Sequence, residues 1–354
     1  MEAVDISTSI GDITFTTCLW NASGPKCTTV GELEDLRDCS HSGALVTKTC
    51  TPLSRKGNEF PRVYSANSAN SANPENPENP ENLRNYKGGH SISVNSVGLA
   101  NLGIDTYLCW IRKQKLSKHP KPIFLSIGGL SMAENKEMLD KISFSPYKPD
   151  FIELNVSCPN IEGCDIVGYD FTLLKQYLNF LTFNINKMRE TNIIKCGIKL
   201  PPYFRETDFD TVGEILNMFA GEIDYVNTIN GVPGGLILDT EMEDSVIKPK
   251  SGFGGLGGTI TKPIGLANVA QLRKRLDKKI DIIGCGGVQF GKDVFEYILC
   301  GAQAVEIATQ ILIEGLDCFE RINNELKVLM KRKGYHSLED FRGNFITHLD
   351  KPPT

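Results

Sequence analysis

Long hydrophobic runs are the first feature that this sequence lacks. No apolar stretch in its 354 residues approaches the roughly 20 residues that a membrane-spanning helix needs. The first 15 residues include Glu2, Asp5 and Asp12 and contain no basic region followed by an apolar one, so we expect no signal peptide. These absences predict a cytoplasmic protein with no membrane partner.

An excess of positive charge is also missing. The formal net charge of -5 at pH 7 argues against general affinity for nucleic acid or for an anionic membrane. Hydrophobic residues make up 40% and charged residues 23%, a composition typical of a globular protein with a substantial core. A chain of this length can form one large barrel or two ordinary domains.

Histidine is scarce, and cysteine follows no regular spacing. The five histidines do not cluster with cysteines at zinc-finger spacing, so we predict no metal site. The eleven cysteines are scattered along a long chain, and their odd number leaves at least one without a disulfide partner. Reduced thiols in the cytosol are therefore the simpler interpretation.

One segment contains no large side chain at all. Residues 65–82 read SANSANSANPENPENPEN, two triplets each repeated in tandem. Such a segment buries too little apolar surface to offset the entropy lost when a chain becomes ordered. We therefore expect a disordered, low-complexity surface insert here.

The rest of the chain alternates short apolar runs with amphipathic stretches. The candidate buried strands are Cys18–Ala22, Ala44–Thr49, Ile123–Ile127, Phe151–Val156, Cys196–Leu200, Tyr225–Ile229, Ile280–Gly284 and Ala304–Ala308. The helical patterns include Thr28–Asp38, Asp105–Leu116, Leu173–Arg189, Phe209–Phe219, Leu266–Leu276 and Asp293–Leu299. Apolar strands that alternate with helices require a parallel sheet with covered faces. About eight such units predict a single-domain α/β protein, a (β/α)8 or TIM barrel over residues 1–354, with Phe319–Lys333 packed outside it.

Polar residues collect where the predicted strands end. They lie in the segments Asn21–Gly24, Lys48–Thr49, Asn155–Asn160, Asn227–Asn230 and Cys285–Gly287, and Lys199 lies within strand five. The carboxyl ends of barrel strands all open onto one face, where barrel enzymes carry their active sites. The pattern therefore favours a ligand site at this face over a set of unrelated turns.

A glycine-rich segment suggests how a phosphate is held. Residues 252–258 read GFGGLGG and contain the spacing GxGxxG, which by itself is weak evidence for dinucleotide binding. The preceding residues 248–251 predict a loop rather than a strand, and residues 261–263 separate the glycines from the next helix. We therefore predict a glycine-rich loop whose backbone N–H groups approach a single phosphate, together with the loops at 285–287 and 308–309.

Several ordered motifs resemble one enzyme family. Residues 153–160 (ELNVSCPN) resemble the catalytic segment of the class 1 dihydroorotate dehydrogenases, and residues 247–258 (IKPKSGFGGLGG) resemble the flavin-phosphate segment of the fumarate-using subgroup, class 1A. Residues 95–99 (NSVGL), 197–204 (GIKLPPYF) and 341–343 (FRG) also match that subgroup in order. The resemblance extends from about residue 21 to residue 343 and is interrupted by the triplet insert.

The resemblance implies FMN as cofactor, a homodimer, and oxidation of dihydroorotate to orotate in pyrimidine biosynthesis, coupled to reduction of fumarate to succinate. Cys158 matches the position of the catalytic base. The positions that match substrate contacts are Lys48, Asn95, Val97, Gly98, Leu99, Asn155, Asn160, Asn230 and Gly231. The positions that match flavin contacts are Ala22, Ser23, Gly24, Lys48, Thr49, Asn95, Asn155, Lys199, Ile229, Gly257, Gly258, Cys285, Gly286, Gly287, Ala308 and Thr309.

The residue types suit that chemistry. Removing two hydrogens from a ring C–C bond requires a base for one proton and an acceptor for a hydride, and a flavin supplies the acceptor. A cysteine with a reference pKa of about 8.5 would serve as a base once deprotonated, so activity should rise with pH unless the site lowers that pKa. Lys199 would stabilise negative charge on the reduced flavin. Lys48, with backbone groups near Gly98 and Leu99, would pair with a substrate carboxylate.

Departures from the family pattern leave alternatives open. Gly231 stands where the family usually has serine, Val97 replaces a methionine, and Ala308 replaces a glycine. A missing serine hydroxyl removes a hydrogen bond of about 1 kcal/mol. The alternatives are a class 1B-type subunit that passes electrons to NAD through an iron–sulfur partner, a Schiff-base lyase that uses Lys48 or Lys199, and a flavin-binding barrel without turnover. The membrane-bound class is disfavoured because it uses serine as the base.

Overall fold

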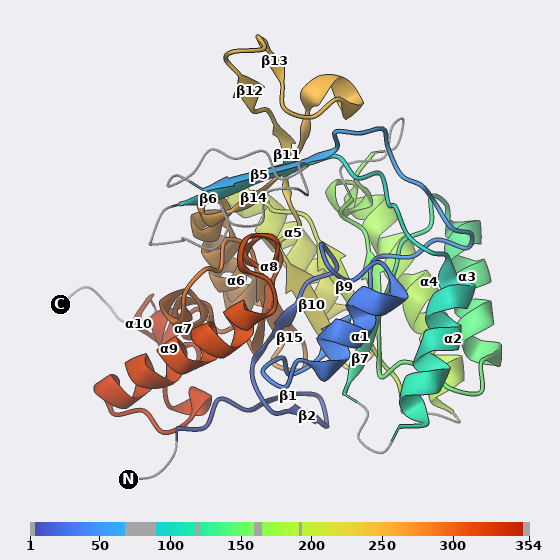
Figure 1. The fold of residues 1–354 in the computed structure, drawn as a ribbon. Coiled ribbons are helices and arrows are strands. Elements are labelled where there is room, and N and C mark those ends of the chain that lie inside the picture. The colour runs from blue at the N-terminus through green and yellow to red at the C-terminus, as the bar shows by residue number, and fades with distance from the viewer. Residues whose placement is uncertain (1–3, 68–89, 118–120, 159–164, 191–192, 350–354) are drawn as a thin grey trace.

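Eight parallel strands form the centre of the molecule (Figure 1). The computed structural model describes residues 4–67, 90–117, 121–158, 165–190 and 193–349. The strands are β3 (Leu19–Asn21), β4 (Leu45–Val46), β7 (Ile123–Ile127), β8 (Phe151–Asn155), β9 (Lys195–Leu200), β10 (Tyr225–Thr228), β15 (Asp281–Cys285) and β16 (Ala304–Ile307). Their order in the sheet is β3-β16-β15-β10-β9-β8-β7-β4. The predicted (β/α)8 barrel is confirmed, with strand positions within a few residues of those expected.

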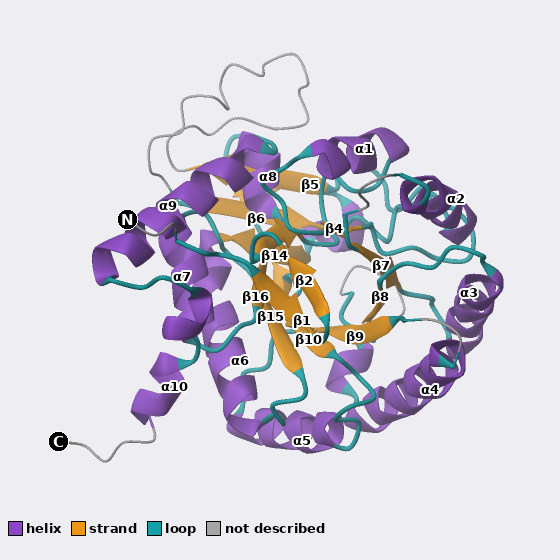
Figure 2. Ribbon diagram, turned by 90° about the horizontal axis from the view of Figure 1, so that it is seen from below, coloured by secondary structure: helices purple, strands orange, loops and turns teal. Residues whose placement is uncertain are grey.

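Helices surround the barrel as a ring (Figure 2). They are α1 (Val30–Asp38), α2 (Ile104–Lys115), α3 (Met132–Phe144), α4 (Phe171–Arg189), α5 (Glu206–Asn217), α6 (Lys262–Arg275), α7 (Gly291–Leu299), α8 (Thr309–Glu314), α9 (Asp317–Lys333) and α10 (Asn344–Leu349). Helix α1 begins where it does because Thr29 and Glu32 form a capping box. Helix α9 ends at Gly334, whose φ of 78° continues the chain in a left-handed conformation. It packs against α7 outside the barrel, as predicted.

The two end strands of the sheet, β3 and β4, meet through a side chain. The Asn21 amide nitrogen donates to Val46 O at 2.7 Å, and Asn21 Oδ1 accepts from Val46 N at 3.0 Å. Further along the seam, Gly43 N donates to Leu19 O at 2.9 Å. A Cβ added to Gly43 would lie 2.3 Å from Thr17 O, so this close approach of two chains requires glycine. The strand-end pattern had predicted that Asn21 lies at the ligand face. Instead, its side chain closes the barrel against Val46.

Aromatic side chains fill the amino-terminal end of the barrel. Phe124 and Phe151 stack with ring centroids 4.0 Å apart, and Phe15 and Trp20 pack beside them. The hairpin of β1 (Thr8–Ile10) and β2 (Ile13–Phe15) covers this end, as seen from below in Figure 2. The chemistry is therefore confined to the opposite, carboxyl end of the strands.

A four-stranded antiparallel sheet lies over the other end of the barrel (Figure 1). Its order is β11 (Val232–Gly235), β14 (Gly254–Gly258), β6 (Ser91–Asn95) and β5 (Val63–Asn67). The predicted glycine-rich loop was therefore wrong for residues 254–258, which form a strand. A Cβ added to Gly254 would lie 2.4 Å from Asn95 O, so glycine lets β14 pack closely against β6.

The predicted insert is partly outside the described residues. Residues 65–67 belong to β5 and pair with residues 91–93 of β6, so the prediction of disorder was wrong for these three. Ser65 is buried under that pairing. Residues 68–82 lie outside the part of the chain that the structure describes.

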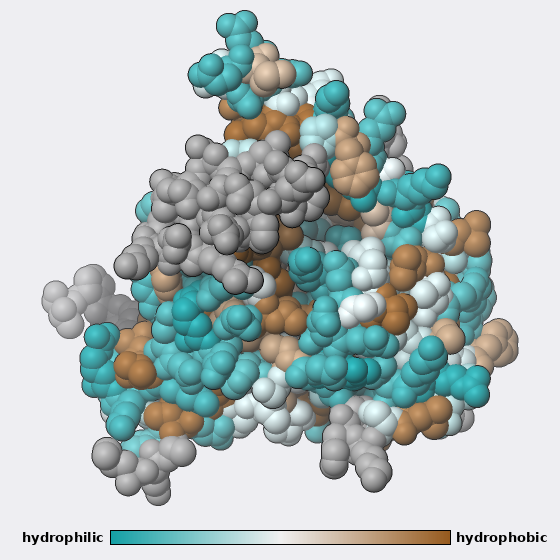
Figure 3. Space-filling view, in the orientation of Figure 1, coloured by the Kyte–Doolittle hydropathy of each residue, from teal (hydrophilic) through white to brown (hydrophobic). Residues whose placement is uncertain are grey.

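A small hairpin projects from the body of the molecule. It consists of β12 (Leu238–Asp239) and β13 (Asp244–Ser245), and the tip is largely hydrophilic in Figure 3, with apolar residues near its base. Within the described residues, short 3-10 turns lie at Val167–Tyr169, Pro249–Gly252, Thr259–Thr261 and Leu338–Asp340. Among the helices that the structure describes, none has the length and apolar character needed to span a bilayer.

Candidate functional site

The loops after the barrel strands converge at the carboxyl end. Lys48 Nζ, after β4, donates to Gly24 O in the loop after β3 at 3.1 Å. A Cβ added to Gly24 would lie 3.4 Å from the Cβ of Ala308, which follows β16. Ala22, in the same loop as Gly24, is buried, and its backbone N–H donates to Ile307 O at 2.8 Å. The structure therefore brings together the predicted residues of the first, second and eighth loops.

A chain of hydroxyl groups lies beneath these loops. Thr49 Oγ1 is 2.9 Å from Ser23 Oγ and 3.0 Å from Ser126 Oγ, and it accepts from Asn155 Nδ2 at 3.0 Å. The four residues come from four different strand ends. Because each hydroxyl both donates and accepts, this network orients the Asn155 amide.

The Asn155 amide in turn braces the segment that carries Cys158. Asn155 Oδ1 accepts from the backbone N–H of Ser157 at 3.1 Å and from its hydroxyl at 2.9 Å. Asn230, after β10, donates to Ser157 Oγ at 2.8 Å, and its Oδ1 accepts from Gly231 N at 2.8 Å. Cys158 follows this brace and is half-buried. Asn160, the next predicted substrate residue, lies outside the described residues.

Another predicted substrate segment lies next to the antiparallel sheet. Asn95 Nδ2 donates to Gly255 O at 3.2 Å, which joins β6 to β14. Gly98 and Leu99 have φ values of 68° and 55°, and a Cβ at Gly98 would lie 2.2 Å from Asn58 Oδ1. Val97 O accepts from Asn58 N at 3.0 Å. Asn58 therefore holds this tight turn in place.

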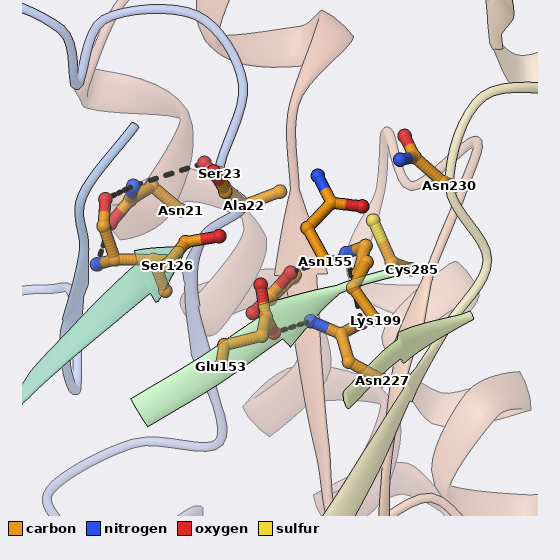
Figure 4. Close-up of polar contacts among 12 residues, drawn as sticks. Asn21, Ala22, Ser23, Ser126, Glu153, Asn155, Lys199, Asn227, Asn230 and Cys285 are labelled. Carbon is orange, nitrogen blue, oxygen red and sulfur yellow. Dashed lines mark hydrogen bonds and ion pairs between the residues drawn. The ribbon is translucent and has the colours of Figure 1, made fainter. Parts of the chain in front are cut away.

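A buried charged cluster lies inside the barrel below the strand ends (Figure 4). Lys199 Nζ donates to Glu306 Oε2 at 2.8 Å and to Asn227 Oδ1 at 2.9 Å. Asn227 Nδ2 donates to Glu153 Oε2 at 2.7 Å. Glu153 and Glu306 are 0% exposed and Lys199 is 5% exposed, so solvent screens none of these charges. We call Glu153, Lys199, Asn227 and Glu306 the buried charge centre.

Burial shifts the pKa values of this centre. Loss of water and the nearby charge of Glu306 raise the pKa of Glu153 to about 7. Burial by itself lowers the pKa of Lys199, but the acidic groups Cys285, Glu306 and Glu153 outweigh it and raise that pKa, so the ammonium stays charged. Burial raises the pKa of the Cys285 thiol to about 11, so Cys285 is a neutral thiol near pH 7.

Glycines form a cradle at one side of the strand ends. A Cβ added to Gly257 would lie 2.6 Å from Ser93 Oγ and 2.9 Å from Thr309 Oγ1. A Cβ added to Gly287 would lie 2.9 Å from Gly258 O. Helix α8 begins at Thr309, and its preceding residue supplies no side-chain cap. The end of β14, the loop at Gly287 and the start of α8 therefore present backbone groups and two short hydroxyl side chains, a lining that suits a phosphate.

Two predicted flavin residues border this cradle. Ile229 is buried, and its N–H donates to Cys285 O at 3.0 Å. A Cβ added to Gly286 would lie 3.3 Å from Ile229 Cγ1. The loops after β10 and β15 therefore lie against each other, as the sequence pattern predicted.

Three residues of the buried charge centre, Glu153, Asn227 and Glu306, were not among the predicted site residues. A signal was available for both glutamates. Glu153 lies two residues before Asn155 on β8, and side chains two residues apart on a strand point to the same face. A glutamate inside an otherwise apolar strand requires a buried polar partner. Because side chains alternate between the two faces of a strand, that partner is expected inside the barrel.

No metal site is evident in the part of the chain that the structure describes. There, no group of three or more histidine, cysteine, aspartate or glutamate side chains is arranged to hold an ion, and no cysteine forms a disulfide.

Comparison with known proteins places this site in context. Residues 5–330 match the family model described as dihydroorotate dehydrogenase. The chain is 42% identical over 339 residues to a dihydroorotate dehydrogenase (fumarate) of Saccharomyces bayanus, covering 96% of this chain and 97% of the relative. It is 41% identical over 343 residues to a dihydroorotate dehydrogenase A (fumarate) of Lactococcus lactis subsp. cremoris, covering 96% and 98%.

A solved structure shares the fold. The ligand-free DHODH of Eimeria tenella aligns with a TM-score of 0.73 at 18% identity and covers 99% of this chain and 93% of its own. At that identity the likeness concerns the fold alone.

Proposed function

Because the chain belongs to the dihydroorotate dehydrogenase family, we propose that it oxidises (S)-dihydroorotate to orotate with FMN as cofactor and fumarate as electron acceptor. It is an oxidoreductase, and this reaction is a step of pyrimidine biosynthesis. The family is flavin-dependent, and the choice of FMN is supported by the glycines at 257, 258, 286 and 287, where the backbone carries no side chain that would block a phosphate.

The observation that carries the proposal is the position of the cradle relative to the buried charge centre. Both lie at the carboxyl end of the barrel strands, with Cys285 next to the glycines of the loop after β15 and within electrostatic reach of Lys199. Gly257, Gly258 and Thr309 would hold the phosphate of the cofactor, and Lys199 would supply a positive charge to its ring. The donor set fits because it pairs backbone N–H groups for the phosphate with an ammonium for the ring.

When bound, the flavin supplies the acceptor for the hydride that leaves one carbon of the substrate ring. Cys158, half-buried at the rim, takes the proton from the neighbouring carbon as a thiolate. Lys199 stabilises negative charge that develops at the cofactor. No other described residue of the segment 151–158 offers a base at the rim, because Glu153 is buried inside the barrel.

The asparagines and Lys48 hold the substrate. Asn95 and Asn230 carry amides with a donor and an acceptor, and Asn155 keeps one N–H beyond the bond to Thr49, which suits the neutral edge of a pyrimidine ring. The half-buried ammonium of Lys48 lies beside Gly24 and would pair with the substrate carboxylate. Asn155 donates a hydrogen bond to Thr49 and accepts one from Ser157, so its amide is oriented before the substrate arrives. This lowers the entropic cost of ordering the side chain on binding.

The purified holoenzyme allows a direct test in the absence of oxygen. Dihydroorotate should bleach the yellow flavin, and later addition of fumarate should restore the colour with formation of succinate. A protein that stays yellow with dihydroorotate would be a flavin-binding barrel without turnover. Bleaching that fumarate does not reverse, but NAD with a partner subunit does, would replace fumarate with the other acceptor.

We also propose that the protein is cytoplasmic and forms a homodimer. The support for a second copy is a group of exposed apolar side chains around the projecting hairpin: Leu238 is 61%, Met242 75% and Phe253 46% exposed. Light scattering should give the mass of two chains, and Leu238→Ser combined with Met242→Ser should favour one chain. A wild-type mass of one chain at micromolar concentration would overturn the dimer.

A further inference from the structure

The buried charge centre holds more negative than positive groups. Glu153 and Glu306 contribute two carboxyls to this centre, and Lys199 contributes one ammonium. The other groups that face the carboxyls carry no charge near pH 7. They are Tyr225 and Asn227 from β10, Cys285 from β15, and Ser126 of β7, which pairs in register with Glu153. With both carboxyls ionised, the centre would carry one uncompensated negative charge away from water.

The two carboxyls do not have equal partners. Glu306 accepts a charge-assisted hydrogen bond directly from the Lys199 ammonium at 2.8 Å. Glu153 accepts from the neutral amide of Asn227 at 2.7 Å and forms no ion pair with Lys199 within 4.0 Å. The ammonium therefore stabilises the ionised form of Glu306 more than that of Glu153.

Each carboxyl also has an oxygen without a partner. Among the described residues, neither Glu153 Oε1 nor Glu306 Oε1 has a partner at normal hydrogen-bond geometry, although both are buried. The Ser126 hydroxyl beside Glu153 lowers the pKa of that carboxyl, but burial and Glu306 raise it by more. An ionised oxygen in this position is costly, whereas a protonated one carries no net charge. Both carboxyls share this feature, so one proton is favoured in the centre, and the weaker partner of Glu153 indicates that Glu153 holds it.

We propose that Glu153 carries a proton in the resting enzyme, so that the buried charge centre is neutral, and that this proton couples the pH of the medium to the flavin. The coupling rests on the proposed function, in which Lys199 supplies a positive charge to the flavin ring. The raised pKa of Glu153 agrees with the geometry. Glu153 is a positioning residue because it acts through Asn227 and Lys199 and does not touch the reacting atoms.

The coupling has a defined proton balance. Transfer of a hydride leaves an additional negative charge at the cofactor, and that charge favours a proton on Glu153. Where Glu153 is ionised, a proton from solvent forms the O–H bond of its carboxyl as the flavin is reduced. No other bond in the centre forms or breaks. Reduction should therefore take up an additional proton at pH values where Glu153 is otherwise ionised.

Infrared spectroscopy of the holoenzyme tests the proton directly, without substrate. The wild type should show the C=O stretch of a buried carboxylic acid on the acid side of pH 7, and this band should fade as pH rises. Glu153→Gln should lack the band. The control Glu137→Gln changes an exposed glutamate that pairs with Lys141 on α3, and it should keep the band. A band that survives in Glu153→Gln would overturn the assignment.

A second measurement does not depend on the variant folding. In wild-type protein with glutamate labelled by 13C at the side-chain carboxyl, one resonance should titrate well above the rest. Uniform titration of all glutamates near their ordinary pKa would also overturn the proposal.

The pH dependence of the flavin midpoint potential tests the coupling separately from the proposed function. The midpoint potential of the flavin should fall more steeply with pH in the wild type than in Glu153→Gln across the titration of Glu153. Parallel slopes would remove the coupling. Failure of dihydroorotate to bleach the flavin would instead refute the proposed function, and the infrared and NMR results would still stand.

Discussion

The side chain of Asn21 and the backbone of Val46 form a two-sided hydrogen bond that closes the barrel. The amide donates to Val46 O at 2.7 Å and accepts from Val46 N at 3.0 Å. These two hydrogen bonds take the place of a strand pairing between β3 and β4. The Asn21 side chain is 0% exposed. An asparagine can make this contact because its amide carries the same donor and acceptor as a peptide group.

Asn21→Ala should destabilise the fold without changing the residues of the site. The substitution leaves the N–H and C=O of Val46 without their partner in a buried seam, and each unsatisfied group costs about 1–3 kcal/mol. We expect the free energy of unfolding to fall by about 2–4 kcal/mol in urea denaturation. Asn179→Ala, on the exposed face of α4, is the matched control and should cost less than about 1 kcal/mol. Equal losses in the two variants would mean that Asn21 does not support the seam.

Gly257→Ala should reduce the flavin content of the purified protein. The new methyl group would lie 2.6 Å from Ser93 Oγ and 2.9 Å from Thr309 Oγ1, so it would displace the short side chains that line the proposed phosphate cradle. We expect at least about a tenfold weaker affinity for FMN, or about 1.4 kcal/mol. Gly31→Ala, in α1 with open space around it, serves as the control and should retain the wild-type ratio of flavin to protein. A full complement of flavin in Gly257→Ala would contradict the cradle.

Cys158→Ala should separate cofactor binding from chemistry. The variant keeps the glycine cradle and the buried charge centre, so it should purify with flavin. Loss of the base should slow reduction by dihydroorotate by about 10²–10⁴-fold in anaerobic stopped-flow mixing. Cys109→Ala, an exposed cysteine on α2, should reduce at the wild-type rate. An unchanged rate in Cys158→Ala would exclude this thiol as the base.

Glu153 should make the stability of the fold depend on pH. Its folded pKa is raised above the unfolded value of about 4.3, so the folded state binds the proton more tightly. Its contribution is therefore fully present below the unfolded pKa and is lost as pH rises through the folded pKa of about 7. The slope for one proton is at most about 1.4 kcal/mol per pH unit.

Urea denaturation between pH 4 and pH 8 measures this contribution. Stability should decline less with rising pH in Glu153→Gln than in the wild type, whereas Glu137→Gln should follow the wild-type profile. Identical profiles for all three proteins would show that Glu153 has the same pKa in the folded and unfolded states.

Local pattern was sufficient to predict the barrel and to propose many residues of the candidate site. Each parallel strand is an apolar run followed by a polar loop, and this pattern identified residues such as Lys48, Asn155 and Lys199 before any pairing was known. The errors came where distant segments meet. Residues 254–258 were interpreted as a loop because a run of glycines has no strand propensity of its own, and their pairing with β6 overrides that preference.

The sequence by itself determined the order of the eight barrel strands and of the helices between them, the residues that end each of these strands, and the segment that carries Cys158, because these depend on hydrophobic periodicity and on short motifs. Only the tertiary structure decided that Asn21 closes the seam to Val46, that Glu153 and Glu306 share the space around Lys199, and that Gly257 lies against Thr309. The reason is physical. Periodicity tells which face of a strand a side chain occupies, but the register between strands sets which side chains meet across the barrel.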